Sequence, residues 1–301
     1  MVIVDIYGGL GNQMFQYALG RHLSHKLNTD FKIDYSYNLI RIDFNPDDIP
    51  SIFDVFNIKG EKATIQEIEK FKAQTENISF KNIYFYLKKR FPSFFSKKYN
   101  FIHESYFNFD KDILSLSNHC YLTGYWQSEK YFIDDEYLIR EDFKILKPLA
   151  GKNLEIAEEI KHTESVSIHL RGRDFINKKE INKLHFTCDN SYYERSFSII
   201  IGRIKDPNFF IFSDDAEWAK YFLKIDYPCT FVDGNSWNKA SFEDMRLMSL
   251  CKHNIIANST FSWWAAWLNR NPAKIVIAPQ KWFNDTSHNT KDLIPGGWLR
   301  L

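Results

Sequence analysis

Cysteine is scarce in this chain of 301 residues, and the four cysteines form no recognisable pattern. Cys120, Cys188, Cys229 and Cys251 are far apart, and there is no Cys-x-x-Cys pair. This spacing argues against a zinc site and against a disulfide framework. We expect reduced thiols in a cytoplasmic protein.

Net charge is also nearly absent, because 39 Lys and Arg residues are set against 38 Asp and Glu residues. This balance offers no general attraction for nucleic acid, so we expect no nucleic-acid partner, and any affinity for anions must be local. No segment approaches the roughly 20 apolar residues of a membrane-spanning helix. The chain opens without the basic and apolar regions of a signal peptide. These absences favour a cytoplasmic location.

Hydrophobic residues are plentiful at 44%, and the length is sufficient for two domains with separate cores. Residues 147–151, which include Pro148 and Gly151, form a candidate hinge. We therefore predict an N-terminal domain at residues 1–147 and a C-terminal domain at residues 148–301.

The first twenty residues, MVIVDIYGGLGNQMFQYALG, carry the most specific local signal. An apolar run predicts a strand over residues 2–6, and an amphipathic helix is predicted from about Asn12. Between them lies a turn that contains Gly8, Gly9 and Gly11. A glycine-rich turn before a helix N-terminus suits a phosphate, because the backbone can approach the anion closely.

The same turn leaves a dinucleotide-binding loop open as an alternative. That loop has the pattern G-x-G-x-x-G, and here Met14 stands where the third glycine is expected. Asp34 ends a second predicted strand over residues 31–34, about where a ribose-binding acid would fall. An NAD-dependent dehydrogenase is therefore a competing hypothesis.

From about residue 152, short apolar strands alternate with single helices, which predicts a parallel sheet with right-handed crossovers. The predicted strands are 165–169, 208–213, 229–232, 254–257 and 274–278. The predicted helices are 153–161, 191–203, 216–224, 242–252 and 262–269. Ligands of such sheets bind at the carboxyl ends of the strands, so the residues that follow each strand are candidates for a site.

The first of these strands ends in His169 and Arg171, which project to the same side because Leu170 separates them. A guanidinium group is suited to bidentate capture of a phosphate. An ion pair between Arg173 and Asp174 is the structural alternative at this strand end.

Two acids, Asp214 and Asp215, follow the second strand at the start of a helix. Helix capping, a divalent-metal site and recognition of a purine base are all open, although no third oxygen ligand for a metal is apparent. We assign capping to Asp214 and base recognition to Asp215. The fourth strand ends in a polar cluster that suits either a diphosphate or plain helix capping. It consists of Asn258, Ser259, Thr260 and Ser262.

Taken together, these segments resemble the α-1,2-fucosyltransferases of bacterial surface-polysaccharide synthesis, which form glycosyltransferase family 11 and use GDP-fucose with inversion. The resemblance rests on GGLGNQMFQYALGRHL (8–23), SIHLRGRD (167–174), FSDDAEWAK (212–220) and NSTFSWWAAWL (258–268). One motif departs from the family. The usual His-x-Arg-Arg-Gly-Asp has its second arginine and glycine exchanged here, so the role of that arginine does not transfer to Gly172.

The resemblance implies an α/β fold of two Rossmann-like domains that face each other across a cleft, which is the GT-B type. The C-terminal domain would hold GDP-fucose, and the N-terminal domain would hold the acceptor. Arg171 and Asn12 would then be catalytic. Donor binding would fall to Gly9, Gly11, His169, Arg171, Asp215, Ser259, Thr260 and Ser262.

The expected reaction moves fucose to the 2-hydroxyl of a terminal galactose in an O-antigen type of unit. No metal and no cofactor are expected, because a fixed arginine and a helix N-terminus can stabilise the leaving diphosphate. Inversion calls for a base at the acceptor hydroxyl. Asp174, Glu180 and His185 lie in one polar loop and are candidates for this base, and Asp174 is the one that we include among the catalytic residues. A GDP-sugar transferase of different linkage and a non-catalytic sugar-binding protein are alternatives.

Residues 84–98, YFYLKKRFPSFFSKK, mix cationic and bulky aromatic side chains. This mixture suits peripheral contact with the anionic inner surface of a membrane, where lipid-linked acceptors are assembled. A helix with its aromatic side chains packed inward and its lysines in water is the alternative.

Overall fold

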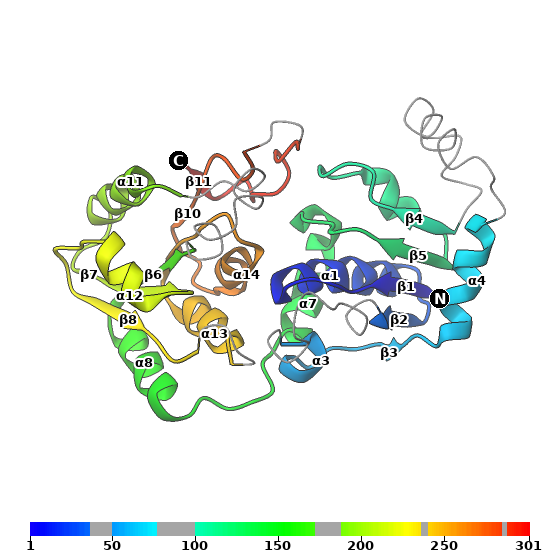
Figure 1. The fold of residues 1–301 in the computed structure, drawn as a ribbon, viewed down its shortest axis with the longest axis horizontal. Helices are drawn as coiled ribbons and strands as arrows, with labels where there is room; N and C mark the ends of the chain where they lie inside the picture. The colour runs from blue at the N-terminus through cyan, green and yellow to red at the C-terminus, as the bar shows by residue number, and fades with distance from the viewer. Residues whose placement is uncertain (37–49, 77–99, 172–187, 236–239, 285–287) are drawn as a thin grey trace.

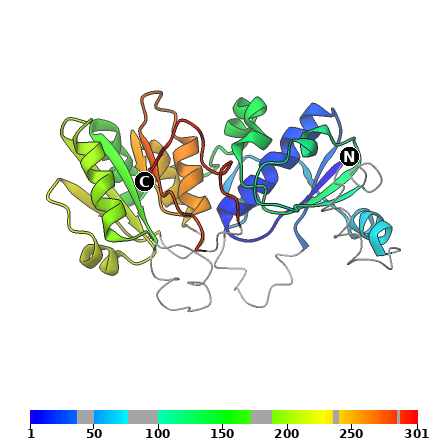
Figure 2. The same ribbon diagram turned by 90° about the horizontal axis from the view of Figure 1, so that it is seen from above.

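The computed structural model describes residues 1–36, 50–76, 100–171, 188–235, 240–284 and 288–301. Two parallel sheets with packed helices lie in separate halves of the molecule (Figure 1). The predicted α/β arrangement of two Rossmann-like domains is confirmed. Seen from above in Figure 2, the halves lie side by side, with one helix of each at their junction.

The N-terminal half contains a five-stranded sheet in the order β3-β2-β1-β5-β4, with every pairing parallel. Val2, Ile3 and Val4 in the central strand are completely buried, as expected for a strand covered on both faces. The strands are β1 (Val2–Asp5), β2 (Phe31–Asp34), β3 (Glu61–Lys62), β4 (Phe101–His103) and β5 (Cys120–Thr123). The α-helices are α1 (Leu10–Lys26), α3 (Ile52–Val55), α4 (Ile65–Glu76) and α7 (Glu136–Asp142). The described residues of this half also form the 3-10 helices η1 (Lys111–Ser115), η2 (Glu129–Tyr131) and η3 (Ile133–Asp135).

The C-terminal half contains a six-stranded parallel sheet in the order β11-β10-β9-β6-β7-β8. Its strands are β6 (Glu164–Leu170), β7 (Pro207–Ser213), β8 (Cys229–Val232), β9 (His253–Ile255), β10 (Val276–Ala278) and β11 (Leu299–Arg300). Its helices are α8 (Gly151–His162), α11 (Asn190–Ile201), α12 (Ala216–Phe222), α13 (Phe242–Leu250) and α14 (Thr260–Leu268). The predicted strands and helices of this half are all present, although their ends differ by a residue or two.

The junction between the halves is a packed aromatic cluster. The ring of Phe15 in α1 lies 4.5 Å from that of Trp263 and 4.9 Å from that of Trp264, both in α14. Trp264 also stacks on Phe132 from the N-terminal half, with ring centroids 5.4 Å apart. These side chains belong to one hydrophobic core that includes residues from both halves. Residues 143–150 carry the chain from α7 to α8 and so from one half to the other (Figure 1).

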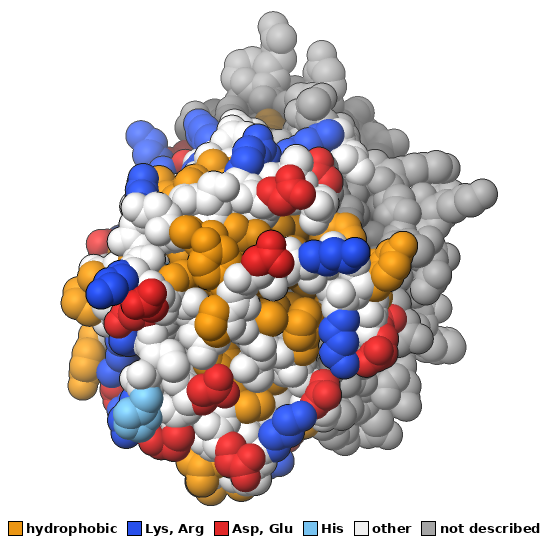
Figure 3. Space-filling view, turned by 90° about the vertical axis from the view of Figure 1, so that its left-hand side faces the viewer, with side chains coloured by type: hydrophobic (Ala, Val, Ile, Leu, Met, Phe, Trp, Pro, Cys, Tyr) orange, Lys and Arg blue, Asp and Glu red, His pale blue; other side chains and the backbone are white. Residues whose placement is uncertain are grey.

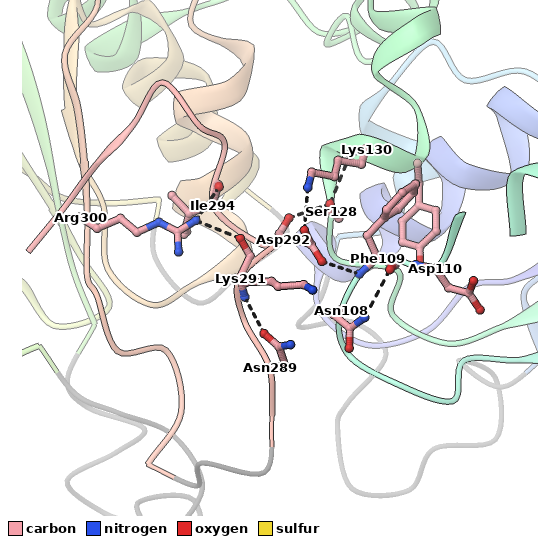
Figure 4. Close-up of polar contacts among 11 residues, drawn as sticks. Asn108, Phe109, Asp110, Ser128, Lys130, Asn289, Lys291, Asp292, Ile294 and Arg300 are labelled. Carbon is pink, nitrogen blue, oxygen red and sulfur yellow. Dashed lines mark hydrogen bonds and ion pairs between the residues drawn. The ribbon is translucent and has the colours of Figure 1, made fainter. Parts of the chain in front are cut away.

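The C-terminal segment returns to the N-terminal half through Asp292 (Figure 4). Its carboxylate forms an ion pair with Lys130 at 2.6 Å and accepts a hydrogen bond from the backbone N–H of Phe109 at 3.1 Å. The hydroxyl of Ser128 donates to the Asp292 carbonyl oxygen at 2.6 Å. The two halves are therefore joined by this segment as well as by the aromatic cluster.

The outer face of the C-terminal half carries basic and acidic side chains side by side, with hydrophobic side chains between them (Figure 3). Such mixing produces no field of a single sign on this face, in keeping with the small net charge. Among the described residues, no helix is both long and apolar enough to cross a bilayer. Residues 84–98 lie outside the described residues. The four cysteines form no disulfide.

Candidate active site

The N-termini of α1 and α14 meet at the junction of the two halves. Gly9 and Ser259 occupy their N-cap positions, and neither helix has a side-chain hydrogen bond that caps it. Gly11 lies directly against Thr260, since a Cβ atom at Gly11 would stand 2.6 Å from the Thr260 carbonyl carbon. The first N–H groups of a helix lack intrahelical acceptors, and its N-terminus carries a partial positive charge. The partial positive charges of the α1 and α14 N-termini therefore lie next to each other.

Asn12 is held by both halves of the molecule. Its Oδ1 accepts hydrogen bonds from Thr260 Oγ1 and from Gln127 Nε2, each at 3.0 Å. Because both donors reach the oxygen, the amide orientation is fixed and Nδ2 remains as the donor of this side chain. The structure thus places Asn12 at the junction of the two halves, and the catalytic role that the family resemblance implies for it stays a prediction.

Two buried glutamines of α1 fix the glycine turn. Gln13 Nε2 donates to the carbonyl oxygen of Gly8 at 2.9 Å. Gln16 accepts from the N–H of Tyr7 at 2.9 Å and donates to the carbonyl oxygen of Gly124 at 3.0 Å. Both glutamines are fully buried. Neither glutamine is predicted from the sequence as a site residue, although two glutamines among the apolar residues of a helix are a signal for such a role.

Arg171 leaves the end of β6 and reaches the N-terminus of α14. Its Nη1 donates to the Ser259 hydroxyl at 3.0 Å. Ser259 is almost completely buried, whereas the arginine is partly exposed. This contact holds a guanidinium group beside a helix N-terminus, and both groups attract an anion such as a phosphate.

His169 precedes Arg171 on the same strand and is buried. Burial, together with the charge of Arg171, lowers the pKa of His169 to about 3, so the imidazole is neutral at physiological pH. Its Nδ1 is buried and has no hydrogen-bond partner among the described residues. A buried ring nitrogen of this kind is suited to a polar atom of a ligand.

The end of β7 corrects one of our assignments. Asp215 caps α12, because its carboxylate accepts a hydrogen bond from the N–H of Trp218 at 2.9 Å. The prediction that Asp214 would cap this helix is therefore wrong. Asp215 has the β-region backbone of an N-cap residue and stands three positions before the N–H that it binds, which is the usual N-cap geometry. Base recognition by Asp215 stays a prediction.

The polar cluster after β9 divides into two parts. Ser259 and Thr260 contact Arg171 and Asn12 as described above. Ser262 is fully buried and donates to the Ser259 carbonyl oxygen at 3.3 Å, and Asn258 donates to the Trp282 carbonyl oxygen at 3.2 Å. These two side chains bind within the C-terminal half, and a donor-binding role for Ser262 stays a prediction.

Several predicted residues lie in the range 172–187, outside the described residues. They are Gly172, Arg173, Asp174, Glu180 and His185. Asp174 therefore stays a predicted catalytic residue. Among the residues that the structure does describe, no three or more His, Cys, Asp or Glu side chains form a group that could hold a metal ion.

The dinucleotide alternative meets a specific obstacle at Asp34. Its carboxylate is buried and accepts a hydrogen bond from the Tyr121 hydroxyl at 2.6 Å and another from the N–H of Ser36 at 2.9 Å. A ribose would have to displace these partners. Asp34 instead joins β2 to β5 within the N-terminal sheet.

Comparisons of the sequence and the structure with known proteins identify a family and a shared fold. The sequence profile of Glycosyl transferase family 11 matches residues 1–301. The chain is 33% identical to an alpha-1,2-colitosyltransferase of Escherichia coli, over 100% of this chain and 99% of that protein. It is 32% identical to the O-antigen biosynthesis glycosyltransferase WbnK of Escherichia coli, over 98% of each. The crystal structure of the fucosyltransferase NodZ from Bradyrhizobium shares the fold, with a TM-score of 0.50, 12% identity and coverage of 88% of this chain and 91% of that one.

Replacing Gly11 with alanine should lower the free energy of unfolding by about 1–3 kcal/mol, because the new methyl group would overlap the Thr260 backbone. The loss should appear despite the higher helix propensity of alanine. Urea denaturation measures it. Gly296→Ala is the control, since its Cβ would meet no atom within 4 Å. Equal stability of the two variants would contradict the close packing at Gly11.

Proposed function

The chain belongs to glycosyltransferase family 11, and on this premise we propose that it transfers fucose from GDP-fucose to the 2-hydroxyl of a terminal galactose, with inversion. The acceptor proposed is an O-antigen type of oligosaccharide unit. Two relatives that align over nearly their full length support this proposal, one by its α-1,2 linkage and the other by its part in O-antigen synthesis.

The observation that carries the proposal is the meeting of two uncapped helix N-termini beside Arg171. A sugar diphosphate placed there would receive N–H groups from α14 and a guanidinium group from β6. As the bond between sugar and phosphate breaks, negative charge grows on the diphosphate. Fixed donors stabilise that charge without reorganisation, which favours departure of GDP.

Asn12 and His169 receive distinct roles in this proposal. The Nδ2 group of Asn12, fixed by Thr260 and Gln127, would donate to the sugar or its leaving oxygen from the N-terminal half. Neutral His169 would contact the nucleotide end of the donor through its buried Nδ1. Gly9 has no side chain to cap α1, so the N–H groups at this helix end would be available to the diphosphate. Asp174 remains the proposed base.

Colitose is a second candidate sugar, because the relative at 33% identity is an alpha-1,2-colitosyltransferase. Colitose is fucose without the 3-hydroxyl, so a single contact to that hydroxyl can decide between the two donors. A cytoplasmic location and contact with the inner membrane surface through residues 84–98 are further parts of the proposal.

Incubation with GDP-fucose or GDP-colitose and a panel of galactose-terminated disaccharides tests the function. We expect transfer of fucose, with linkage analysis placing it on the 2-hydroxyl of galactose. GDP should also raise the melting temperature while NAD leaves it unchanged, since only a ligand that binds the folded state stabilises it. Transfer of colitose without transfer of fucose would replace GDP-fucose by GDP-colitose as the proposed donor. A lack of any transfer, with no effect of GDP on melting, would reject the proposal.

Arg171→Ala should lower kcat at least about 100-fold, because the developing charge on the diphosphate loses a fixed donor. Arg171→Lys keeps the charge but not the bidentate geometry, so it should recover only part of the rate. Steady-state kinetics measure both variants. Matching melting temperatures are the control for folding. Full activity in Arg171→Ala would remove this residue from the mechanism.

Transfer should persist in excess EDTA, because the proposed stabilisation of GDP comes from Arg171 and a helix N-terminus rather than from a divalent cation. The measurement compares initial rates with and without EDTA after removal of adventitious metal. Loss of activity that magnesium or manganese restores would overturn the metal-independent mechanism.

A further inference from the structure

Glu104 binds a loop that leads to the active site. It directly follows β4, and its N–H donates to the Thr123 carbonyl oxygen at 2.9 Å. One carboxylate oxygen accepts from the N–H of Tyr125 at 2.6 Å, and the other accepts from the N–H of Trp126 at 3.1 Å. A single side chain thus binds two consecutive amides of residues 124–127, which we call the 124–127 loop.

The loop needs such a partner because its backbone is strained. Trp126 has φ +56, a left-handed conformation that is unfavourable for a bulky residue. Its side chain is nevertheless buried, and its ring lies edge-on to that of Tyr131 at 5.7 Å. Gly124 has no room for a side chain, since a Cβ there would stand 2.3 Å from the Cβ of Glu104. The loop and the glutamate therefore fit closely together.

The loop ends on a residue that holds Asn12. Directly after Trp126, Gln127 is buried and donates through Nε2 to Asn12 Oδ1 at 3.0 Å. At the start of the loop, the Gly124 carbonyl oxygen accepts from Gln16, which in turn accepts from the N–H of Tyr7. A shift of the loop would thus disturb both the Asn12 amide and the glycine turn.

We propose that Glu104 is a positioning residue for sugar transfer, which acts by holding the 124–127 loop so that Gln127 fixes the Asn12 amide. This inference rests on the function proposed above, because that function gives Asn12 its part in the reaction. Burial raises the pKa of the Glu104 carboxyl to about 7, and the two amide donors act in the opposite direction. These amides therefore help to keep the group ionised near neutral pH.

Glu104→Gln is the central variant, because it keeps the size of the side chain but presents an NH₂ group to one of the two amides. We expect kcat to fall about tenfold or more, since misplacement of a group at the reacting centre is costly in rate. GDP affinity should fall much less than kcat, because Arg171 and His169, the two side chains proposed to bind GDP, lie in the C-terminal half.

A double-mutant cycle with Gln127→Ala distinguishes positioning from a merely structural role. If Glu104 acts through Gln127, the double variant loses no more activity than Gln127→Ala alone. If the activity loss of the double variant instead equals the product of the two single fold-losses, the proposal is overturned. Should Glu104→Gln fail to melt cooperatively, Glu104→Asp takes its place in the cycle, because it keeps the charge but is one methylene too short for both amides.

Hydrogen exchange supplies a readout that needs no activity. The amides of Tyr125 and Trp126 should exchange faster in Glu104→Gln. Their exchange rates should stay unchanged in Gln127→Ala, because this substitution leaves the two hydrogen bonds to Glu104 in place. Unchanged exchange in Glu104→Gln would show that Glu104 does not hold the 124–127 loop. If the wild-type chain transfers no sugar, the proposed function fails, while the exchange comparison still decides whether Glu104 holds the loop.

Discussion

The packing of α14 against α1 is the contact on which the rest of the structure depends. The indole N–H of Trp264 donates to the carbonyl oxygen of Gly11 at 2.9 Å, and Gly11 offers no side chain to separate the helices. The same close approach brings Thr260 within reach of Asn12 and places the two helix N-termini together. This helix pair therefore contributes to the stability of the junction and also forms the candidate site, and a change that separates the helices affects both.

The opposite end of α14 is stabilised by two cations. Arg140 of α7 donates to the carbonyl oxygens of Trp267 and Leu268, and Lys274 donates to those of Ala266 and Asn269. Burial and the nearby Arg140 lower the pKa of Lys274 to about 8, which leaves it mostly protonated at neutral pH. Positive charge at a helix C-terminus is favourable, whereas the N-terminus of α14 has no acidic side chain in its first turn. The partial negative charge at the C-terminus of α14 is thus neutralised, whereas the partial positive charge at its N-terminus remains to attract an anion.

The C-terminal half was predictable because its strands are apolar runs separated by single helices, so that each element is visible in its own residues. The N-terminal half was less so. The two exposed residues of β3, Glu61–Lys62, form a strand only because β2 pairs with them. The site residues differ in whether their signal is local in the sequence. Arg171 and Asn12 lie at strand and helix ends that the sequence identifies, whereas Gln127 and Glu104 matter through contacts with distant segments. The choice between Asp214 and Asp215 depended on backbone geometry, which two adjacent acids do not specify.

The glycine turn resembles a dinucleotide-binding loop in sequence but has a different structural role. In a dinucleotide loop, the third glycine permits close packing of helix and strand within one βαβ unit. Here that position is Met14, which is completely buried in the hydrophobic core, and the close approach is made by Gly11 toward the other half of the molecule. Asp34, which a dinucleotide-binding loop would use to bind ribose, accepts a hydrogen bond from Tyr121 instead. The turn therefore packs against the second domain, and a ligand bound at its helix end would lie between two domains instead of within one.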